Sequence, residues 1–410
     1  MSLIRFLALL GAALLCGCAT TGSPPRAASA PAPLILISID GLRDQALEPG
    51  VTPTLQRLAQ EGVRADGMTP SYPSLTFPNH YTLVTGLRPD HHGIIHNTMH
   101  EAPRGMFRIT DPKAVTDAAW WGGEPIWVGA EKAGIPTATL SWPGSEAAIG
   151  GVRPTYWNRY DESVPISDRV AQVLAWLDPP PGQPRPRFLT LYMEHVDKAG
   201  HSYGPESPQY KDALAKVDRA IGELVDGLAR KGMLETTNLM VVSDHGMATV
   251  RPDQLVAIED MVAPELARLV SSGQSVGFAP RPGREAEAEA RLLGRHDHYE
   301  CWKKDALPAR WRYGTHPRVP AIICQMDEGW DALPRAHLAE RGARERGSHG
   351  YDPALPAMQA VFIARGPAFA RNQRLPRVDN VDVYPLLAHL LGIAPAANDG
   401  NPGTLRKALR

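Results

Sequence analysis

This sequence has almost no excess of charge of either sign. Its 410 residues include 43 Lys and Arg against 44 Asp and Glu, which leaves a formal net charge of −1. No polybasic stretch occurs, and we therefore predict no groove for nucleic acid. Long apolar runs are scarce as well, because the run at residues 6–15 is too short to span a bilayer comfortably. The length favours one large α/β domain with a substantial insertion, or two domains.

Cysteine is also rare. Of the four cysteines, Cys16 and Cys18 lie in the N-terminal segment, which leaves Cys301 and Cys324 in the rest of the chain. These two could pair in an oxidising compartment. The sequence leaves the disulfide open, because it does not show whether the two Cα atoms come within bonding distance.

The N-terminal segment is typical of an exported protein. Residues 1–17 combine one basic residue with an apolar run and are predicted to be a signal peptide. Residues 15–18 resemble a bacterial lipobox in which Cys18 would be acylated, and residues 18–33 would form a flexible tether. We expect a lipoprotein facing the periplasm, with the outer membrane favoured because Ala19 rather than Asp follows the cysteine. Without lipidation, the same segment would release a soluble periplasmic protein.

Short apolar runs alternate with helical patterns along most of the chain. Apolar residues at helical spacing predict helices that begin near residue 53 and over residues 210–231. This alternation predicts an α/β fold with a mostly parallel central sheet and helices on both faces. The predicted strands are residues 34–39, 137–141, 188–193, 239–242 and 360–363.

The alternation breaks up between residues 251 and 338. This stretch is rich in turn-forming residues and flanks a predicted helix at residues 284–293. We interpret it as a small inserted subdomain within a core domain over residues 34–393. Residues 394–410 are expected to be a C-terminal tail.

Acidic and imidazole side chains follow two of the predicted strands. Asp40 comes directly after residues 34–39, and Asp244 and His245 come shortly after residues 239–242. In open α/β sheets, ligands bind at the carboxyl ends of the strands. We therefore expect these three side chains to meet at one edge of the sheet.

A second group of such residues lies elsewhere in the chain. Asp197 and His201 are four residues apart, which places them on one face if their segment is helical, and His349 follows a glycine and a serine. Taken singly, each residue is more often a helix cap or a surface side chain. Together, three carboxylates and three imidazoles suit two divalent metal ions, with zinc favoured over manganese or iron.

Thr76 lies between two prolines, just before a helical pattern at residues 81–85. Its hydroxyl would therefore lie near a helix N-terminus, where free N–H groups and the helix dipole favour a phosphate. On local features alone, a helix cap is the simpler interpretation.

Two longer motifs surround this threonine. They are Pro73-Ser-Leu-Thr76-Phe77-Pro-Asn-His80 and Thr85-Gly-Leu-Arg-Pro-Asp-His-His-Gly-Ile94 with Asn97 following. With the metal motifs, they run in order from residue 34 to about residue 393. In this set the chain resembles the bacterial nucleotide pyrophosphatase/phosphodiesterase family of the alkaline phosphatase superfamily. The resemblance implies an alkaline-phosphatase-like catalytic domain over most of the chain.

The resemblance also implies roles for individual residues. Asp40, Thr76, Asp244 and His245 would surround one zinc ion, and Asp197, His201 and His349 the other. Asn97 would donate a hydrogen bond to a phosphate oxygen. Phe77, Tyr160 and Tyr192 would form a slot for a nucleotide base, although both tyrosines could instead be core aromatics.

The implied reaction is hydrolysis of nucleotide phosphodiester or pyrophosphate bonds to nucleoside 5′-monophosphates. A Thr76 alkoxide stabilised by a divalent metal would attack phosphorus, and water would then release the phospho-threonine intermediate. Because Asn97 carries no positive charge, a diester is favoured over a monoester. We expect a monomer that binds a small nucleotide substrate and contacts the membrane through its lipid anchor.

Two other functions stay open. The same two-metal core could hydrolyse phosphonates or phospholipid headgroups, because the core determines the reaction more tightly than the substrate pocket does. From a different class, the chain could be a non-catalytic envelope lipoprotein that binds a metal or a phosphate-containing ligand.

Overall fold

The computed structural model describes residues 32–410 except 49, 342 and 343. The predicted signal peptide, Cys18 and all but the last two residues of the predicted tether lie outside the described residues. In the part of the chain that is described, no helix combines the length and the apolar character needed to cross a bilayer.

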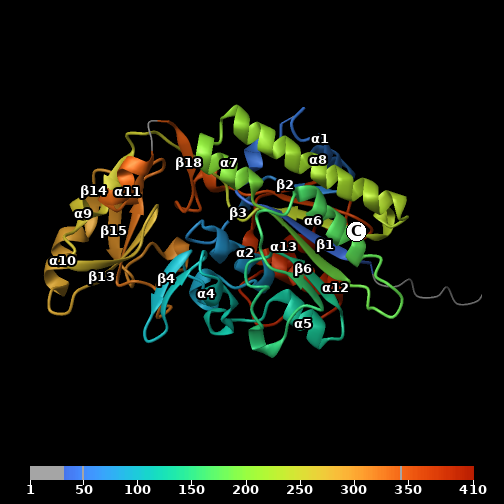
Figure 1. Ribbon diagram of the computed structural model, residues 1–410, viewed down its shortest axis with the longest axis horizontal. Helices are drawn as coiled ribbons and strands as arrows, with labels where there is room; N and C mark the ends of the chain where they lie inside the picture. Colours follow the sequence, from blue (N-terminus) through green and yellow to red (C-terminus); the bar gives the residue numbers. More distant parts are fainter. Residues whose placement is uncertain (1–31, 49, 342–343) are drawn as a thin grey trace, which may run out of the picture. The chain divides into compact units, whose positions relative to one another are not determined.

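An eight-stranded sheet forms the centre of the fold (Figure 1). Strands β9, β1, β8, β6 and β7 are mutually parallel, which confirms the predicted mostly parallel sheet. In sheet order the strands are β20 (Gln373–Leu375), β2 (Val63–Ala65), β19 (Phe362–Arg365), β9 (Asn238–Val242), β1 (Leu34–Ile39), β8 (Phe188–Met193), β6 (Thr137–Leu140) and β7 (Tyr156–Asn158).

Strand β19 is the exception to the parallel arrangement. It runs antiparallel to both β9 and β2, and its first residue, Phe362, pairs with the last residue of β9, Val242. A parallel strand needs a crossover that returns the chain to the opposite edge of the sheet. Only a single 3-10 turn, Pro356–Met358, lies between His349 and β19, so the strand starts at the edge where β9 ends.

Helices cover both faces of this sheet, as predicted. The side chains of β1 alternate: Ile35, Ile37 and Ile39 face one hydrophobic cluster, whereas Leu34 and Leu36 face another. The first cluster includes residues of α1 (Pro53–Glu61), α6 (Ile166–Trp176) and α8 (Pro208–Arg230). The second includes residues of α2 (Thr76–Thr85), α5 (Ile126–Lys132) and α12 (Val383–Leu391).

Two further elements carry residues of interest. Helix α7 (His195–Tyr203) follows β8 after one residue. The short strand β18 (Arg346–Ser348) pairs antiparallel with β10 (Ala248–Val250), which begins three residues after His245. Helix α7 therefore starts close to the carboxyl edge of the central sheet, and β18 lies close to the same edge through its pairing with β10.

The stretch predicted as an insertion contains a separate five-stranded antiparallel sheet. The predicted helix at residues 284–293 is α10 (Glu285–Leu292). The sheet order is β12 (Ala267–Ser271), β13 (Ser275–Pro280), β16 (Ile322–Met326), β15 (Tyr299–Lys303) and β14 (Gly294–His296). Beside this sheet, β11 (Leu255–Ala257) pairs in parallel with β17 (Asp331–Leu333).

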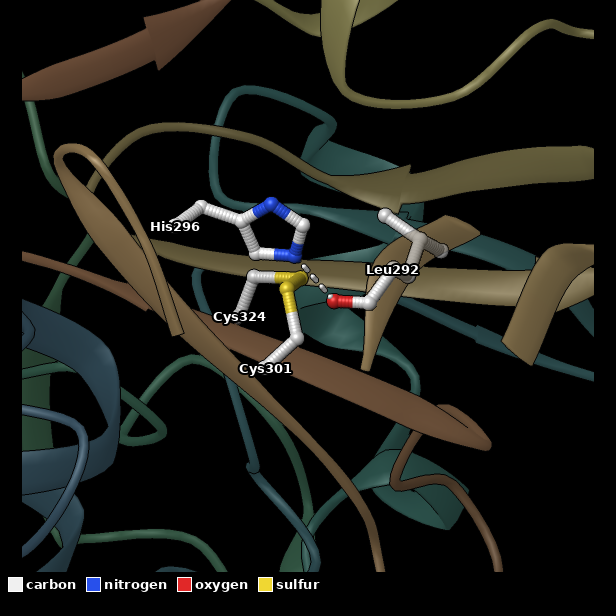
Figure 2. The surroundings of a disulfide bond; sticks show 4 residues. All are labelled: Leu292, His296, Cys301 and Cys324. Atoms are coloured by element: carbon white, nitrogen blue, oxygen red, sulfur yellow. Dashed lines mark hydrogen bonds between the residues drawn. A yellow bond between two sulfur atoms is a disulfide. The ribbon is translucent and has the colours of Figure 1, made fainter. Parts of the chain in front are cut away.

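The two cysteines of this stretch form a disulfide (Figure 2). Cys301 on β15 and Cys324 on β16 are directly opposite in the ladder, and both are buried. Near them, the ring of His296 bonds through Nε2 to the carbonyl oxygen of Leu292 over 2.8 Å. The pairing that the sequence left open is therefore present.

The last residues of the chain pack onto the domain. Helix α13 (Pro402–Arg406) buries Leu405, and Ala408 follows it into the cluster that contains α12. The backbone N–H of Arg88 donates to Asp399 over 2.8 Å. Residues 394–410, expected as a tail, thus pack against the fold through the buried side chains of Leu405 and Ala408.

A buried carboxylate on α8 holds the start of α1. Asp218 is 1% exposed and accepts from the backbone N–H groups of Thr54 at 3.0 Å and Leu55 at 2.8 Å. These N–H groups belong to the first helical turn, where no intrahelical acceptor exists. The contact joins two helices on the same face of the sheet.

Replacing this carboxylate should destabilise the protein. We expect Asp218→Ala to lower the free energy of unfolding by about 2–3 kcal/mol, since two hydrogen bonds to a charged group are lost in a buried place. Asp226→Ala, at an exposed position of the same helix, should change it by less than about 0.5 kcal/mol. Urea unfolding measures both, and equal midpoints for the two variants would contradict the assignment.

Candidate active site

Two neighbouring strands bring Asp40, Asp244 and His245 together. The chain leaves β1 at Asp40 and leaves β9 two residues before Asp244, and the two strands are parallel neighbours. The N–H of Gly41 donates to Asp244 Oδ1 over 3.2 Å, at a φ of 67° that glycine adopts without strain. All three side chains are buried, so the expected meeting point at the sheet edge exists.

The Nε2 atom of His245 is the centre of a first cluster. It lies 3.0 Å from Asp244 Oδ2, 3.5 Å from Asp40 Oδ1 and 3.3 Å from Thr76 Oγ1. Donor atoms bound tetrahedrally to one zinc ion stand about 3.3 Å apart, given bond lengths of about 2.0–2.1 Å. The spacing of these four atoms therefore fits one small cation.

Asp197, His201 and His349 form a second cluster. Asp197 and His201 lie one turn apart on α7, and His349 follows β18 directly. His349 Nε2 is 3.0 Å from His201 Nε2 and 3.4 Å from Asp197 Oδ1. The rings of His245 and His349 stack with centroids 3.6 Å apart, so the two clusters adjoin. His245 is also near enough to Asp197 and His349 to share a cation with them.

Backbone carbonyl groups orient all three imidazoles. The pairs are His201 Nδ1 with Gly347 O at 3.0 Å, His245 Nδ1 with Gly246 O at 2.9 Å, and His349 Nδ1 with Ser74 O at 3.0 Å. A carbonyl can only accept, so each Nδ1 carries a proton and each Nε2 turns its lone pair toward the clusters. Metal-binding histidines have this arrangement.

The carboxylates also fit metal ions. Oδ1 of Asp40, Oδ1 of Asp197 and Oδ2 of Asp244 are buried and have no hydrogen-bond donor within the described residues. Burial, with the neighbouring Asp244 and Asp197 carboxylates, raises the pKa of Asp40 well above its usual value. Unpaired buried oxygens and mutual repulsion are both relieved by bound cations. The residues of the two clusters therefore fit two divalent metals.

Opposite pKa shifts distinguish the neighbouring groups. Burial would raise the pKa of Asp244, but the positive charge that His245 and His80 carry when they are protonated holds it well below its usual value. Burial and the neighbouring His245 and His201 lower the pKa of His349 well below its usual value. Such opposed shifts in one place are typical of functional sites.

Thr76 is the first residue of α2 and does not cap it. The N-cap position is Leu75, and no side chain caps this end of the helix. Instead, the buried Thr76 hydroxyl points to the first cluster at 3.3 Å from His245 Nε2. The cap interpretation of Thr76 is therefore wrong, because its hydroxyl bonds the cluster and not the helix.

Asn97 bonds Phe77, the residue directly after Thr76. The N–H of Phe77 donates to Asn97 Oδ1 over 3.0 Å, which fixes the amide of Asn97 at the start of α2. Because Oδ1 is engaged, the Nδ2 group can donate to another partner. Phe77 is partly buried and packs against Phe107 and Trp121, with ring centroids 6.1 and 6.0 Å apart.

The two tyrosines differ in their surroundings. Tyr192 is 7% exposed, and its hydroxyl donates to Asp40 Oδ2 over 2.5 Å, so it matches the core-aromatic alternative better than a base-stacking role. Tyr160 is 42% exposed and meets the ring of Tyr192 edge-on at 6.0 Å. Of the two rings, Tyr160 has the free surface that a base would need.

His80 is a site residue to which the sequence reasoning gave no role. Its Nε2 bonds the hydroxyl of Ser38 at 2.8 Å, and its Nδ1 lies 2.9 Å from Thr76 O and 3.2 Å from Asp244 Oδ2. The signal was available, because residue 80 is one helical turn after residue 76 and shares its face. His80 thus connects the start of α2 to Asp244.

This arrangement can be compared with known proteins. The sequence matches the family described as type I phosphodiesterase / nucleotide pyrophosphatase over residues 34–352. The chain belongs to this family. The match covers both clusters, Thr76 and Asn97.

Curated relatives agree with this assignment. A venom phosphodiesterase of Crotalus durissus collilineatus is 34% identical over 92% of this chain and 46% of its own length. Ectonucleotide pyrophosphatase/phosphodiesterase family member 1 of Mus musculus is 35% identical over 92% of this chain and 43% of its own length. A pyrophosphatase/phosphodiesterase of Schizosaccharomyces pombe is 34% identical over 90% of this chain and 78% of its own length. The chain spans about half the length of the venom and mammalian relatives, and the bacterial lineage stays a prediction.

Solved structures show the same fold. Murine ectonucleotide pyrophosphatase/phosphodiesterase 5, as an inactive threonine-to-alanine variant in complex with AMP, has a TM-score of 0.87 and 31% identity, covering 92% of this chain and 100% of that one. The human protein of the same name has a TM-score of 0.86 and 32% identity, covering 92% of this chain and 99% of that one. The predicted alkaline-phosphatase-like α/β fold is confirmed.

Zinc should stabilise the folded protein. After removal of metals with a chelator, zinc at 100 times the dissociation constant of a cluster should raise the free energy of unfolding by about 2.7 kcal/mol for each cluster that it fills, because it binds the folded clusters only. Asp244→Asn should lose the part of this gain that comes from the first cluster at the same zinc concentration, whereas Asp226→Asn on α8 should keep the whole gain. Urea unfolding with and without zinc measures the difference, and an equal gain in all three proteins would contradict the assignment.

Proposed function

We propose that this protein is a metal-dependent phosphodiesterase that releases nucleoside 5′-monophosphates from nucleotide phosphodiester or pyrophosphate bonds. The observation that carries the proposal is the position of the Thr76 hydroxyl. It lies at the first residue of α2, 3.3 Å from His245 Nε2, where a nucleophile would face both the cluster and the free N–H groups of the helix. The relatives' names as phosphodiesterases and nucleotide pyrophosphatases support it.

The two clusters would hold the metals. Asp40, Thr76, Asp244 and His245 would hold one divalent ion, and Asp197, His201 and His349 the other, with zinc favoured by the mixed ligands. When bound, the metals would stabilise the Thr76 alkoxide and the negative charge that develops on phosphorus and the leaving oxygen.

The reaction would proceed in two displacements. Thr76 Oγ1 attacks phosphorus, and the bond from phosphorus to the leaving oxygen breaks, giving a diester of Thr76. Water then attacks phosphorus from the side of the departed group, and the bond to Thr76 breaks. Two inversions give net retention at phosphorus. The murine neighbour whose threonine-to-alanine variant is called inactive supports a threonine nucleophile.

Asn97 supports a diester as substrate. Its amide is fixed by the N–H of Phe77, so Nδ2 would donate to a phosphate oxygen without adding positive charge. A phosphate monoester carries one more negative charge than a diester, which a neutral donor does not balance. The charges of two divalent metals, three carboxylates and one alkoxide would sum to zero around a singly charged diester.

A nucleoside is the favoured part of the substrate. Phe77 directly follows the nucleophile, and Tyr160 offers an exposed ring next to the buried Tyr192. Aromatic rings at this place suit stacking with a base. The murine neighbour in complex with AMP supports the same substrate class.

Export and lipidation are part of the proposal. Residues 1–17 would direct the chain out of the cytoplasm, and acylated Cys18 would anchor it through the tether at residues 18–33, with the catalytic domain following as a monomer. Several relatives are named venom or ectonucleotide enzymes, which agrees with export.

The ratio of two activities tests this function. On zinc-loaded protein without residues 1–33, kcat/KM for the p-nitrophenyl diester of thymidine 5′-monophosphate should exceed kcat/KM for p-nitrophenyl phosphate, because the site balances one negative charge. Thr76→Ala should abolish both activities and so serves as the control for contaminating enzymes. A ratio below one would mean that the protein is a monoesterase.

Asn97 can be tested by two substitutions. Asn97→Ala should lower kcat/KM for the diester by roughly 10–1000-fold, as loss of one oxyanion donor does. Asn97→Asp keeps the acceptor for the Phe77 N–H but places a negative charge beside the phosphate, so it should lower kcat/KM further. Steady-state kinetics of both variants measure this, and wild-type values for Asn97→Ala would remove Asn97 from the mechanism.

A further inference from the structure

Residues on both sides of His349 contact one buried carboxylate, that of Asp331 in the stretch predicted as an insertion. Asp331, the first residue of β17, is 1% exposed. Arg346 Nη2 donates to its Oδ2, and Gln274 Nε2 donates to its Oδ1 at 2.6 Å. The Tyr351 hydroxyl lies 3.3 Å from the same Oδ1 and 3.2 Å from Trp330 O. Arg346 lies three residues before His349, and Tyr351 lies two residues after it. Asp331 thus holds both flanks of this imidazole.

Gln274 extends the contact to the residue directly before His349. Its Nε2 also lies 2.5 Å from Ser348 Oγ, so one amide group bonds both Asp331 and Ser348. Ser348 is buried and pairs with Ala248 in the ladder of β10 and β18. The strand that leads into His349 is therefore held by the inserted segment on one side and by β10 on the other.

The same network reaches the segment that carries the proposed nucleophile. Ser74 Oγ donates to Tyr351 O over 2.9 Å, and Ser74 O accepts from His349 Nδ1 at 3.0 Å. Ser74 lies two residues before Thr76. A change in the position of Tyr351 would therefore alter the carbonyl that orients the ring of His349.

We propose that Asp331 is a positioning residue for the second metal cluster. Through Arg346, Gln274 and Tyr351 it sets the orientation of the His349 imidazole, and this orientation sets the affinity of the cluster for a divalent cation. Groups that orient a metal ligand without touching the metal commonly change its affinity by 10–100-fold when they are replaced. The inference concerns metal affinity, and it rests on the proposed function only where activity is measured.

Zinc titration of the full chain tests the proposal. Asp331→Asn keeps the shape of the side chain and removes its charge, so Arg346 loses its partner. After chelator treatment, isothermal titration with zinc should show one binding event as in the wild type and a second event weakened about 10–100-fold. Asp327→Asn removes only the exposed ion pair with Arg295 in the same segment and should leave both events unchanged.

Two results would overturn the proposal. The first is a pair of zinc affinities in Asp331→Asn equal to those of the wild type. The second is a lower melting temperature of Asp331→Asn together with an unchanged zinc affinity of the second cluster, since this is what a purely structural role predicts. Where Asp331→Asn loses its near-ultraviolet circular dichroism, Gln274→Ala decides instead, because it keeps the ion pair between Asp331 and Arg346. Folded Gln274→Ala should show a weakened second event, and an unchanged one would overturn the proposal.

An activity measurement adds a second readout. The zinc concentration that gives half-maximal diester hydrolysis should rise in Asp331→Asn by the same factor as the second dissociation constant, while the maximal rate at saturating zinc returns toward the wild-type rate. A wild-type protein that binds two zinc ions but hydrolyses no diester would overturn the proposed function alone, because the comparison of affinities needs no catalysis.

Discussion

Electrostatic repulsion among three carboxylates, each with a buried oxygen, is the constraint on which the site depends. Asp40, Asp197 and Asp244 each present an oxygen that has no donor within the described residues. Water cannot screen these charges, so cations must compensate them. The imidazoles around them have their protons held on Nδ1 by backbone carbonyls, which leaves only lone pairs facing inward. The protein thus supplies excess negative charge and electron pairs in one small volume.

The arrangement of strands explains why this concentration of charge is tolerated. Asp40 and Asp244 lie at the ends of adjacent parallel strands, so their backbone positions are set by the ladder and not by the side chains. Tyr192 donates a hydrogen bond to Asp40 from outside the cluster, and His80 Nδ1 lies 3.2 Å from Asp244 Oδ2. Burial of the apolar side chains of the sheet stabilises the fold, and this offsets the repulsion among the carboxylates at its carboxyl edge.

Much of the candidate site was predictable because its residues follow regular elements. Asp40 and Asp244 stand after short apolar strands, and Asp197 and His201 have the spacing of one helical turn, so local patterns sufficed. The hydroxyl of Tyr192 was not predictable, because its partner Asp40 is 152 residues away and the same ring could equally serve as a stacking surface. Asp331 gave no signal at all, since its partners Arg346 and Gln274 come from different elements. The direction of β19 depends on a missing crossover, which apolar periodicity does not reveal.

The pairing of β2 has a consequence for how the chain is made. Its neighbours in the sheet are β19 and β20, so residues 63–65 have no strand to pair with until residues 362–375 have been synthesised. An unpaired strand edge is a template for association with other chains. Until those residues have been synthesised, the backbone groups of residues 63–65 have no partner strand in this sheet. Completion of the sheet is a late and cooperative event governed by contacts between distant parts of the sequence.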